Sequence, residues 1–308
     1  MNADLTTILG PVDWQVLHRS GFINCPGAEL HTTATGARDT RLYLDRVPTI
    51  FCLHKGCRMK VREANILLRR ALLEQGDWTP PPPTPQQEAR RERQMEYERQ
   101  ERRLAVAKDA VLTGYAWPLN SLRAASPVPI RPYGWPQLLD LFDEKDTIWV
   151  GEPHHSGSSM HLRNFRRVTA WRQLAIPPAP FICANPFTAG GVSRTVERIE
   201  TPRHMVIECD ELHPDPVLNR EMSGAVFKYL LTVRPNLRLR AVIDSGNKSL
   251  HGWFTYDAEA HEWAIAVLPA LGVDPATLRL AQPVRAPGYR RDTGRIQELL
   301  YLDTTIPK

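Results

Sequence analysis

The chain has 308 residues, of which 42% are hydrophobic and 24% charged, and its formal net charge is +5. Such a composition excludes wholesale disorder and the length predicts about two domains, while the mild positive charge permits an anionic partner without requiring one. No run of 18 apolar residues is present and the N-terminus lacks a basic segment followed by a long apolar one, so we expect a soluble, cytoplasmic protein with no membrane contact.

Cysteine and histidine residues cluster in the first sixty positions. Cys25 with His31, and Cys52 with Cys57, form two close pairs separated by strand-forming residues. Zinc takes four tetrahedral Cys or His ligands, and two such pairs joined by a short hairpin are typical of a zinc ribbon. We therefore predict a structural zinc site of Cys25, His31, Cys52 and Cys57, with His54 as the substitute for His31. The alternative is three ordinary buried thiols with incidental histidines.

The next segments divide the chain. Residues 60–70 predict a short basic helix, which could contact phosphates or simply face solvent. Five prolines in residues 79–85 indicate a linker, and the mixed charges of residues 86–108 favour a solvated helix held by i,i+4 pairs over a nucleic-acid-binding one. The predicted organisation is a zinc-binding module at 1–78, a linker and charged helix at 79–110, and a larger module at 111–308.

The larger module shows alternating strand and helix patterns. Its first half predicts a strand at 147–150 and a helix at 162–174. Its second half predicts, in order, a strand at 204–210, a helix at 216–233, strands at 237–244 and 250–256, a helix at 257–271 and a strand at 296–302. This order predicts an α+β fold with a mostly antiparallel sheet and helices on one face, similar to an RNA-recognition motif (RRM).

Two carboxylates end the first strand of that second half. Alternation places Val206, Glu208 and Asp210 on one face, whereas the opposite face is wholly apolar. The two acids lie about 7 Å apart along the strand. There they could bind a hard cation such as Mg²⁺ or Mn²⁺. A solvated strand end is the alternative.

Two further motifs carry charge at the ends of core elements. The turn before the strand at 250–256 is rich in small and cationic residues, and its backbone N–H groups and Lys248 could cradle phosphates. His251 projects from that strand onto the same surface as the carboxylates. Residues 285–295 then hold four arginines against one aspartate, which suits phosphate oxygens. The alternatives are that the first motif is an ordinary hairpin turn and that the second is a solvated loop.

Together these segments resemble the catalytic domain of the archaeo-eukaryotic primase (AEP) superfamily, in its phage and plasmid primase-polymerase branch. The resemblance covers about residues 200–302. VIECDEL is similar to the family's first motif, with Glu208 replacing the first Asp, AVIDSGNKSLHGWF is similar to its second, and PVRAPGYRRDTGRIQELLYL resembles its third region. The N-terminal cysteine pairs also resemble the zinc ribbons of such replication proteins.

The resemblance implies a DNA primase or polymerase with an RRM-like core. Such a nucleotidyltransferase would copy single-stranded DNA from NTPs or dNTPs with two Mg²⁺ or Mn²⁺ ions, for a mobile genetic element such as a phage or plasmid. Glu208 and Asp210 would bind the ions and His251 the incoming triphosphate. Five residues would contact the nucleotide's phosphates: Ser245, Lys248, Arg285, Arg290 and Arg291. The chain has no Walker motif, so a separate helicase is expected.

One departure concerns the third metal-binding acid. The family carries it on a strand before the R-x-P-G segment, but LAQPVRAPG has none. Asp274, Asp244 and Asp292 are the candidates to replace it. A catalytically inactive DNA-binding replication initiator is therefore the rival function, and a metal-dependent nuclease is a weaker third one.

Overall fold

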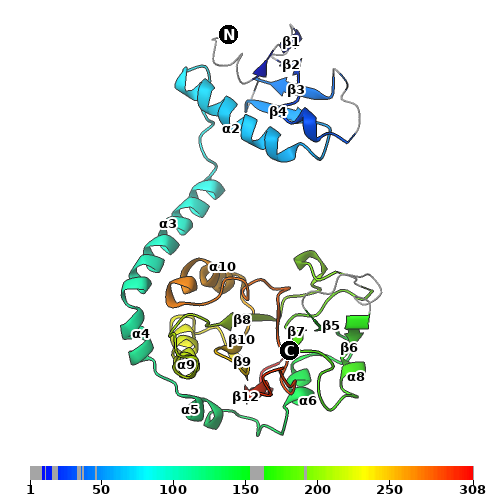
Figure 1. Cartoon of the computed structure of the whole chain (residues 1–308). Helices are drawn as coiled ribbons and strands as arrows, with labels where there is room; N and C mark the ends of the chain where they lie inside the picture. Colours follow the sequence, from blue (N-terminus) through cyan, green and yellow to red (C-terminus); the bar gives the residue numbers. More distant parts are fainter. Residues whose placement is uncertain are drawn as a thin grey trace. The chain divides into compact units, whose positions relative to one another are not determined.

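The computed structural model describes residues 9–10, 12–15, 20–32, 36, 38–45, 47–152, 163–190 and 193–307. The chain divides into two compact units, unit 1 at Met1–Arg90 and unit 2 at Arg91–Lys308 (Figure 1). Among the helices of the described residues, none has the length and apolar character that a membrane span needs.

Unit 1 is a four-stranded antiparallel sheet with one helix on it. Its strands lie in chain order: β1 (Val12–Gln15), β2 (Ser20–Ile23), β3 (Thr40–Tyr43) and β4 (Thr49–Cys52). Helix α2 (Arg58–Glu74) is longer than the basic helix that we predicted, and it packs Leu68 and Leu72 against Leu42 and Ile50 of the sheet. A short 3₁₀ turn, η1 (Ala28–Leu30), follows β2.

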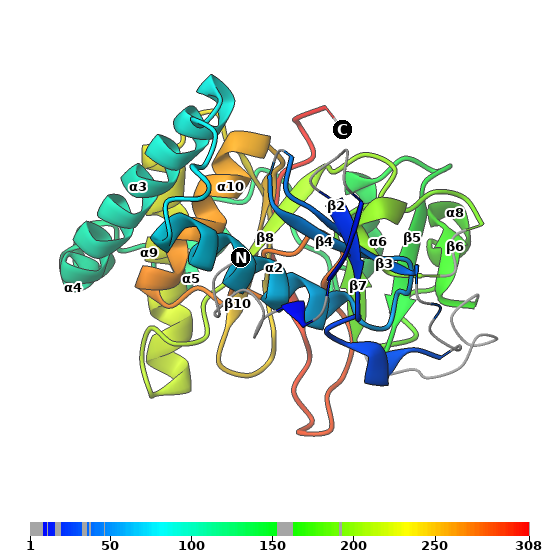
Figure 2. The ribbon, with the colours of Figure 1, turned by 90° about the horizontal axis from the view of Figure 1, so that it is seen from above.

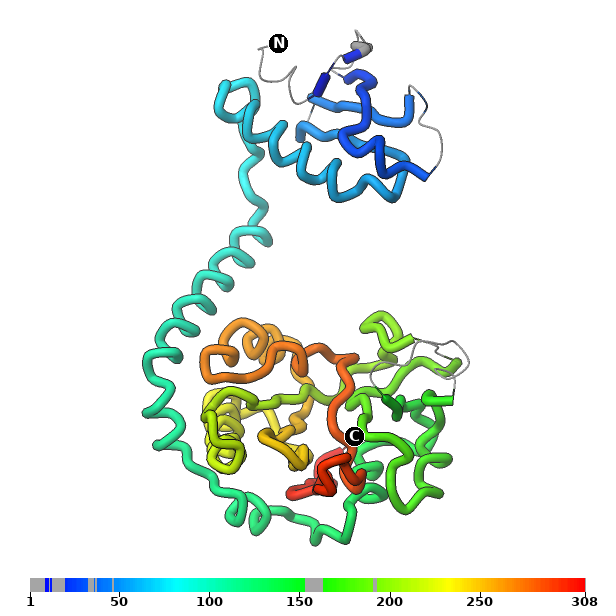
Figure 3. Tube along the Cα trace, viewed as in Figure 1, coloured from blue at the N-terminus to red at the C-terminus, as the bar shows by residue number. Residues whose placement is uncertain are grey.

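The linker and the charged helix lead from unit 1 into unit 2. Residues 79–84 contain no helix or strand and continue into α3 (Pro85–Val106), as the trace in Figure 3 shows. The second half of α3 is not simply solvated, because Tyr97 and Leu104 are buried in the core of unit 2. Gln100 also accepts a hydrogen bond from the indole of Trp263 at 2.7 Å. The mixed-charge pattern of residues 86–108 did not predict these contacts.

Unit 2 has a central antiparallel sheet with helices on one face. Across the sheet the order is β12 (Glu298–Leu302), β9 (Leu239–Asp244), β10 (Leu250–Thr255) and β8 (His204–Glu208). Helices α9 (Pro216–Val233) and α10 (Ala258–Val267) cover the same face of this sheet (Figure 2). The coarse prediction of an α+β unit with antiparallel pairing is therefore confirmed.

Local sequence explains where these two helices begin and end. Asp215 accepts hydrogen bonds from the amides of Val217 and Leu218, and Asp257 accepts one from Ala260, so each aspartate caps a helix N-terminus. The second helix passes into a 3₁₀ turn, η4 (Leu268–Leu271), and stops at Gly272, directly after the predicted end of the helix at 257–271.

A second antiparallel sheet covers the other face of the central sheet. Its strand order is β11 (Pro283–Arg285), β7 (Phe181–Cys183), β5 (Thr147–Gly151) and β6 (Phe165–Arg167). A core that includes Trp135, Ile148, Ile182 and Trp253 fills the space between the two sheets. Of this layer only β5 was predicted, as a strand at 147–150; β6, β7 and β11 were not, because three-residue strands carry almost no periodic pattern.

Short helical segments complete unit 2. They are α4 (Lys108–Gly114), α5 (Leu119–Ala124), α6 (Trp135–Leu138), η2 (Leu139–Leu141), α8 (Val168–Trp171) and η3 (Val196–Arg198). The predicted helix at 162–174 is wrong over most of its length, and Leu162 lies outside the described residues. Residues 165–167 pair with β5 instead, so tertiary pairing overrides the local helical pattern there.

Candidate functional site

Four elements of unit 1 bring the predicted zinc ligands together. Cys25 follows β2, His31 follows η1, Cys52 ends β4 and Cys57 caps the N-terminus of α2. The ligand atoms of these four side chains all lie within 4.8 Å of one another. Three thiols and one imidazole in such a group can hold a zinc ion, and with four protein ligands the site leaves no open position for a substrate, which fits a structural role.

The backbone around the cluster is built for close approach. The amide of Gly27 points to Cys25 Sγ at 3.5 Å. A Cβ atom at Gly56 would lie 2.5 Å from the carbonyl oxygen of Leu30, so only glycine fits between the two ligand-bearing turns. These contacts hold the turns in register.

His54, the alternative ligand, lies beside the cluster. Its ring stacks on that of His31 with 3.9 Å between the centroids, and its Nδ1 lies 3.5 Å from Cys52 Sγ. Its Nε2 lies 3.9 Å from Asp39 Oδ2. The converging group contains His31 and not His54, so we assign His54 to a supporting position next to the ligands.

In unit 2, Glu208 and His251 meet across neighbouring strands. The two residues are direct partners in the β8–β10 register, and Nε2 of His251 lies 3.1 Å from Oε1 of Glu208. Ser249 donates a hydrogen bond to the same carboxylate oxygen at 2.6 Å, and Ser249 Oγ in turn lies 3.2 Å from Ser245 Oγ. A buried polar network therefore fixes Glu208.

Asp210 lies just beyond the end of β8 and is held differently. Lys248 Nζ lies 3.3 Å from its Oδ2, whereas its Oδ1 is buried and has no hydrogen-bond partner among the described residues. The predicted face is therefore right for both carboxylates, although the strand ends at Glu208. Each acid already faces one basic side chain.

The surroundings shift the pKa values of Glu208 and Asp210 in opposite directions. Burial acts to raise the pKa of Glu208, but the charge of His251 and the hydrogen bonds from His251 and Ser249 outweigh it and lower that pKa to about 2. Burial and the neighbouring Glu208 charge raise the pKa of Asp210, and Lys248 only partly opposes them. The pair thus combines one strongly ionised carboxylate with one that holds its proton more tightly.

None of the three candidate acids completes a metal site with this pair. Asp244 forms an ion pair with Arg220 at 3.3 Å and accepts from the amide of Gly246. Asp274 lines a cavity of about 440 Å³ together with Asp210, and Asp292 lines a different one. In the part of the chain that the structure describes, the cluster in unit 1 is the only group of three or more His, Cys or acidic residues placed to hold a metal.

The turn between β9 and β10 differs from the predicted phosphate cradle. Gly246, with φ of 70°, allows the tight turn. The amide of Gly246 donates to the side chain of Asp244, and the amides of Asn247 and Ser249 donate to the hydroxyl of Ser245. These donors are thus already bonded within the turn, so of the predicted cradle the side chain of Lys248 is the group left for a phosphate contact.

The predicted arginines separate into two kinds. Arg285 lies near the pair, since its amide is 3.4 Å from Nδ1 of His251, and its guanidinium stacks on Phe181 at 4.1 Å. Arg291 donates to the backbone oxygen of Ser245 at 3.0 Å. Arg290 instead bonds the carbonyl of Gly294 within its own hairpin, at 2.8 Å. Only the first two lie beside the carboxylate pair.

A cavity of about 420 Å³ lies at one end of the second sheet, beside the hairpin of residues 289–293, and includes both of these arginines. Its walls include Glu152, Phe181, Arg285, Tyr289 and Arg291. Burial and the nearby Arg291 charge lower the pKa of Arg285. Two arginines, two acids (Glu152 and Asp292), an aromatic ring and a phenol line this cavity, so its arginines could meet an anionic group and its rings a planar one.

Sequence reasoning did not identify three polar or aromatic residues near this region. Ser249 stands two residues before His251 on the same strand face, and this spacing was the signal that could have found it. Gln297 is fully buried, and neither side-chain polar atom has a hydrogen-bond partner among the described residues. Phe181 belongs to a three-residue strand whose position only the fold reveals.

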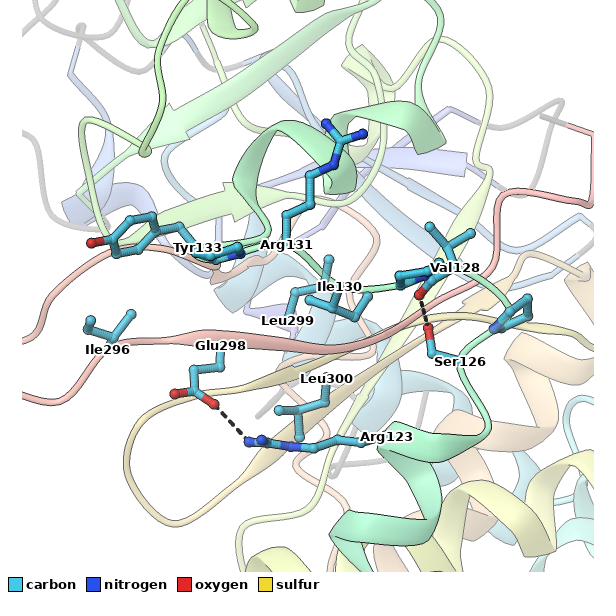
Figure 4. A pocket seen from close by; sticks show the side chains of 13 residues that line it. Arg123, Ser126, Val128, Ile130, Arg131, Tyr133, Ile296, Glu298, Leu299 and Leu300 are labelled. Carbon is cyan, nitrogen blue, oxygen red and sulfur yellow. Dashed lines mark hydrogen bonds and ion pairs between the residues drawn. The ribbon is translucent and has the colours of Figure 1, made fainter.

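A cavity of about 680 Å³ lies elsewhere on unit 2, between β12 and residues 126–133 (Figure 4). Arg123 and Glu298 form an ion pair of 2.8 Å at its rim, and Ser126 donates to the carbonyl of Val128. None of the predicted site residues lines it. Although this cavity is larger than the one lined by Arg285, we do not take it as the candidate site, because no predicted site residue lines it.

Comparison with known proteins found no matching protein-family model, no matching curated protein and no matching solved structure.

Proposed function

We propose that unit 2 is a template-dependent nucleotidyltransferase of the AEP type, a DNA primase or primase-polymerase. The observation that carries the proposal is the meeting of Glu208, Asp210 and His251 at one end of the central sheet, where Arg285 borders His251 and Arg291 bonds the backbone of Ser245. The acids, the imidazole and the arginines come from three separate sequence motifs, so their proximity is not a consequence of local sequence.

The order of elements gives partial support to the RRM-like core in this proposal. Strands and helices follow as β8, α9, β9, β10, α10 and β12, which is the βαββαβ order of ferredoxin-like folds. The strand arrangement departs from that fold, because β8 lies at an edge of the sheet where a ferredoxin-like fold has its first strand inside. The proposal therefore depends on the site more than on the topology.

In this function Glu208 and Asp210 would hold Mg²⁺ or Mn²⁺. Bound there, the metal would stabilise the attacking and leaving oxygens of in-line nucleotidyl transfer. The low pKa of Glu208 keeps a carboxylate available at neutral pH. Lys248, now paired with Asp210, would exchange that acid for a triphosphate oxygen, and Arg285 and Arg291 would neutralise further phosphate charge.

A primer-synthesis assay tests this function. Asp210→Asn should abolish metal-dependent, template-directed products while single-stranded DNA binding persists, because Arg285 and Arg291 are unchanged. His251→Ala should lower the rate less, by about 10²–10³-fold, as for loss of one charge-stabilising contact. Glu298→Gln, an acid on the same sheet that pairs with Arg123 away from the site, is the matched control. Near-normal synthesis by Asp210→Asn would contradict the proposal.

The second candidate function is DNA binding without catalysis, as in a replication initiator. It is favoured by the pairing of each carboxylate with a basic side chain and by the absence of a third converging acid among the described residues. The same assay separates the two functions. DNA binding without any product, in Mg²⁺ and in Mn²⁺, would support this second function.

A further inference from the structure

One face of the unit 1 sheet carries aromatic rings and arginines. Phe22, Arg41 and Phe51 are direct neighbours across β2, β3 and β4. Leu42 and Ile50 point into the core beneath α2, so the residues that alternate with them point to the opposite face. Tyr43 lies on that same face, one step along β3.

The arginines of this face contact the rings. The guanidinium carbon of Arg41 lies 5.5 Å from the centre of the Phe22 ring and 5.1 Å from that of Tyr43, and Arg38 lies 5.8 Å from Phe22. These are cation–π distances, so the charged groups lie over the rings.

These arginines are not paired with acids in the residues that the structure describes. Arg41 Nη2 donates to Ser20 Oγ at 3.0 Å, and its Nε is buried without a hydrogen-bond partner among the described residues. Neither Arg38 nor Arg41 forms an ion pair with an acidic group anywhere in the described ranges. The face therefore presents positive charge that pairs with no carboxylate in the described part of the chain.

Apolar area is also exposed beside this charge. Phe51 is 52% exposed, and Leu53, just past the end of β4, is 68% exposed. One exposed ring and two partly exposed ones, beside guanidinium groups without an acidic partner among the described residues, match a chain of planar bases joined by phosphates. A duplex hides its bases in the stack, so the rings match a single strand better.

We propose that this aromatic platform (Phe22, Arg41, Tyr43 and Phe51, with Arg38 at its edge) binds single-stranded DNA. Bases would stack on the rings and phosphates would bind the arginines. The zinc cluster would then serve recognition indirectly, because it fixes the ends of β2 and β4, which carry Phe22 and Phe51. The choice of DNA over RNA rests on the proposed function, whereas the single-strand binding itself does not.

The test uses the full-length, zinc-loaded chain and fluorescence anisotropy with a labelled oligothymidylate, without nucleotide or added Mg²⁺ or Mn²⁺. Phe51→Ala should weaken binding by about fivefold or more, the usual effect of losing one stacked base. The same variant should bind an abasic strand of equal length as the wild type does. Phe51→Tyr should restore binding. Leu67→Ala removes an equally exposed side chain, at 52%, from α2 and should have no effect.

Arg41→Gln tests the electrostatic half of the proposal. It should weaken binding to both the intact and the abasic oligonucleotide. It should also reduce the slope of log affinity against log salt by about 0.7, as for one lost phosphate contact. Arg70→Gln on α2, where Arg70 pairs with Glu74 at 3.0 Å, is the matched control. Zinc content and melting temperature show whether each variant is folded. If Arg41→Gln does not fold, Phe51→Ala still tests the proposal, because the Phe51 side chain is half exposed and its loss should not affect folding.

Several outcomes would overturn the platform. Phe51→Ala could bind oligothymidylate as tightly as the wild type does, or lose as much affinity for the abasic strand as for the intact one. The chain could bind oligouridylate more tightly than oligothymidylate through Phe51. It could also form a dimer in sedimentation that Phe51→Ala dissociates. Because the binding assay needs no catalysis, a chain that binds DNA here but makes no primers would contradict only the proposed transferase.

Discussion

Glu208 and Asp210 lie two residues apart, yet their environments favour opposite charge states. Glu208 faces His251 and accepts from Ser249, whereas Asp210 keeps a buried oxygen without a hydrogen-bond partner among the described residues. A carboxylate that gains partners on folding stabilises the fold when ionised, and one that mainly loses water destabilises it. The two acids should therefore differ in their effect on stability.

For Glu208 the folded pKa of about 2 lies below the ordinary 4.5. Its ionised form therefore stabilises the fold above about pH 4.5, and this contribution is lost as the pH falls towards 2. Glu208→Gln should lower the free energy of unfolding by about 3 kcal/mol at pH 7. Urea unfolding at pH 7 and at pH 3, without added divalent metal, checks this. The difference between variant and wild type should shrink at the lower pH, and a constant difference would contradict it.

Asp210 should behave in the opposite way. Its pKa is raised on folding from the ordinary 3.8, so its stabilising contribution is present at low pH and is lost as the pH rises through the folded value. Asp210→Asn should therefore unfold at higher urea concentration than the wild type at pH 7, with no such gain near pH 3. A destabilised Asp210→Asn at pH 7 would show that the Lys248 ion pair outweighs the burial of this acid.

At the scale of elements, the zinc cluster joins the ends of two strands, a 3₁₀ turn and a helix. Its ligands follow β2 and η1, end β4 and begin α2, so one ion would tie together most of the small unit. A unit with only a modest core depends on such a tie, because metal-binding free energy adds directly to folding free energy.

We expect the full-length chain to bind one zinc ion. Cys57→Ser should lose the ion and melt unit 1, seen as a separate low-temperature transition in calorimetry and by metal analysis. Cys183→Ala is the control, because this thiol is fully buried in unit 2, where burial raises its pKa to about 12. Zinc retained by Cys57→Ser, or folding unchanged by a chelator, would contradict the assignment.

At the scale of the whole molecule, the chain passes from unit 1 to unit 2 through a proline segment and then α3. The first part of this region, residues 79–90, is exposed throughout. The later part carries Tyr97 and Leu104 into the core of unit 2. Because proteases need an exposed and locally unfolded backbone, the two parts should differ in susceptibility.

Brief trypsin treatment should therefore cut after Arg90 or Arg91 and spare Arg103, leaving two stable fragments identified by mass spectrometry. Leu104→Ala should destabilise unit 2 by about 2 kcal/mol or more and expose Arg103 to cleavage. Val106→Ala, at an exposed position of the same helix, should change neither. Early cleavage at Arg103 in the wild type would show that α3 is not held by unit 2.

The sequence by itself determined the features that depend on local patterns. Ligand spacing identified Cys25, His31, Cys52 and Cys57, since two close pairs across a hairpin can converge on one point. Alternation placed Glu208 and His251 on one face of their strands, and helical periodicity gave the bounds of α9. In each case a strong period or a fixed spacing extends over enough residues to dominate the local conformation.

Tertiary structure alone decided the rest. Strands β6, β7 and β11 are three residues long and form because they pair with distant segments, not because their residues favour strands. The burial of Tyr97 and Leu104, the pairing of Lys248 with Asp210 and the separation of Arg285 from Arg290 all depend on which segments pack together. Such contacts join residues far apart in the chain, and no local period records them.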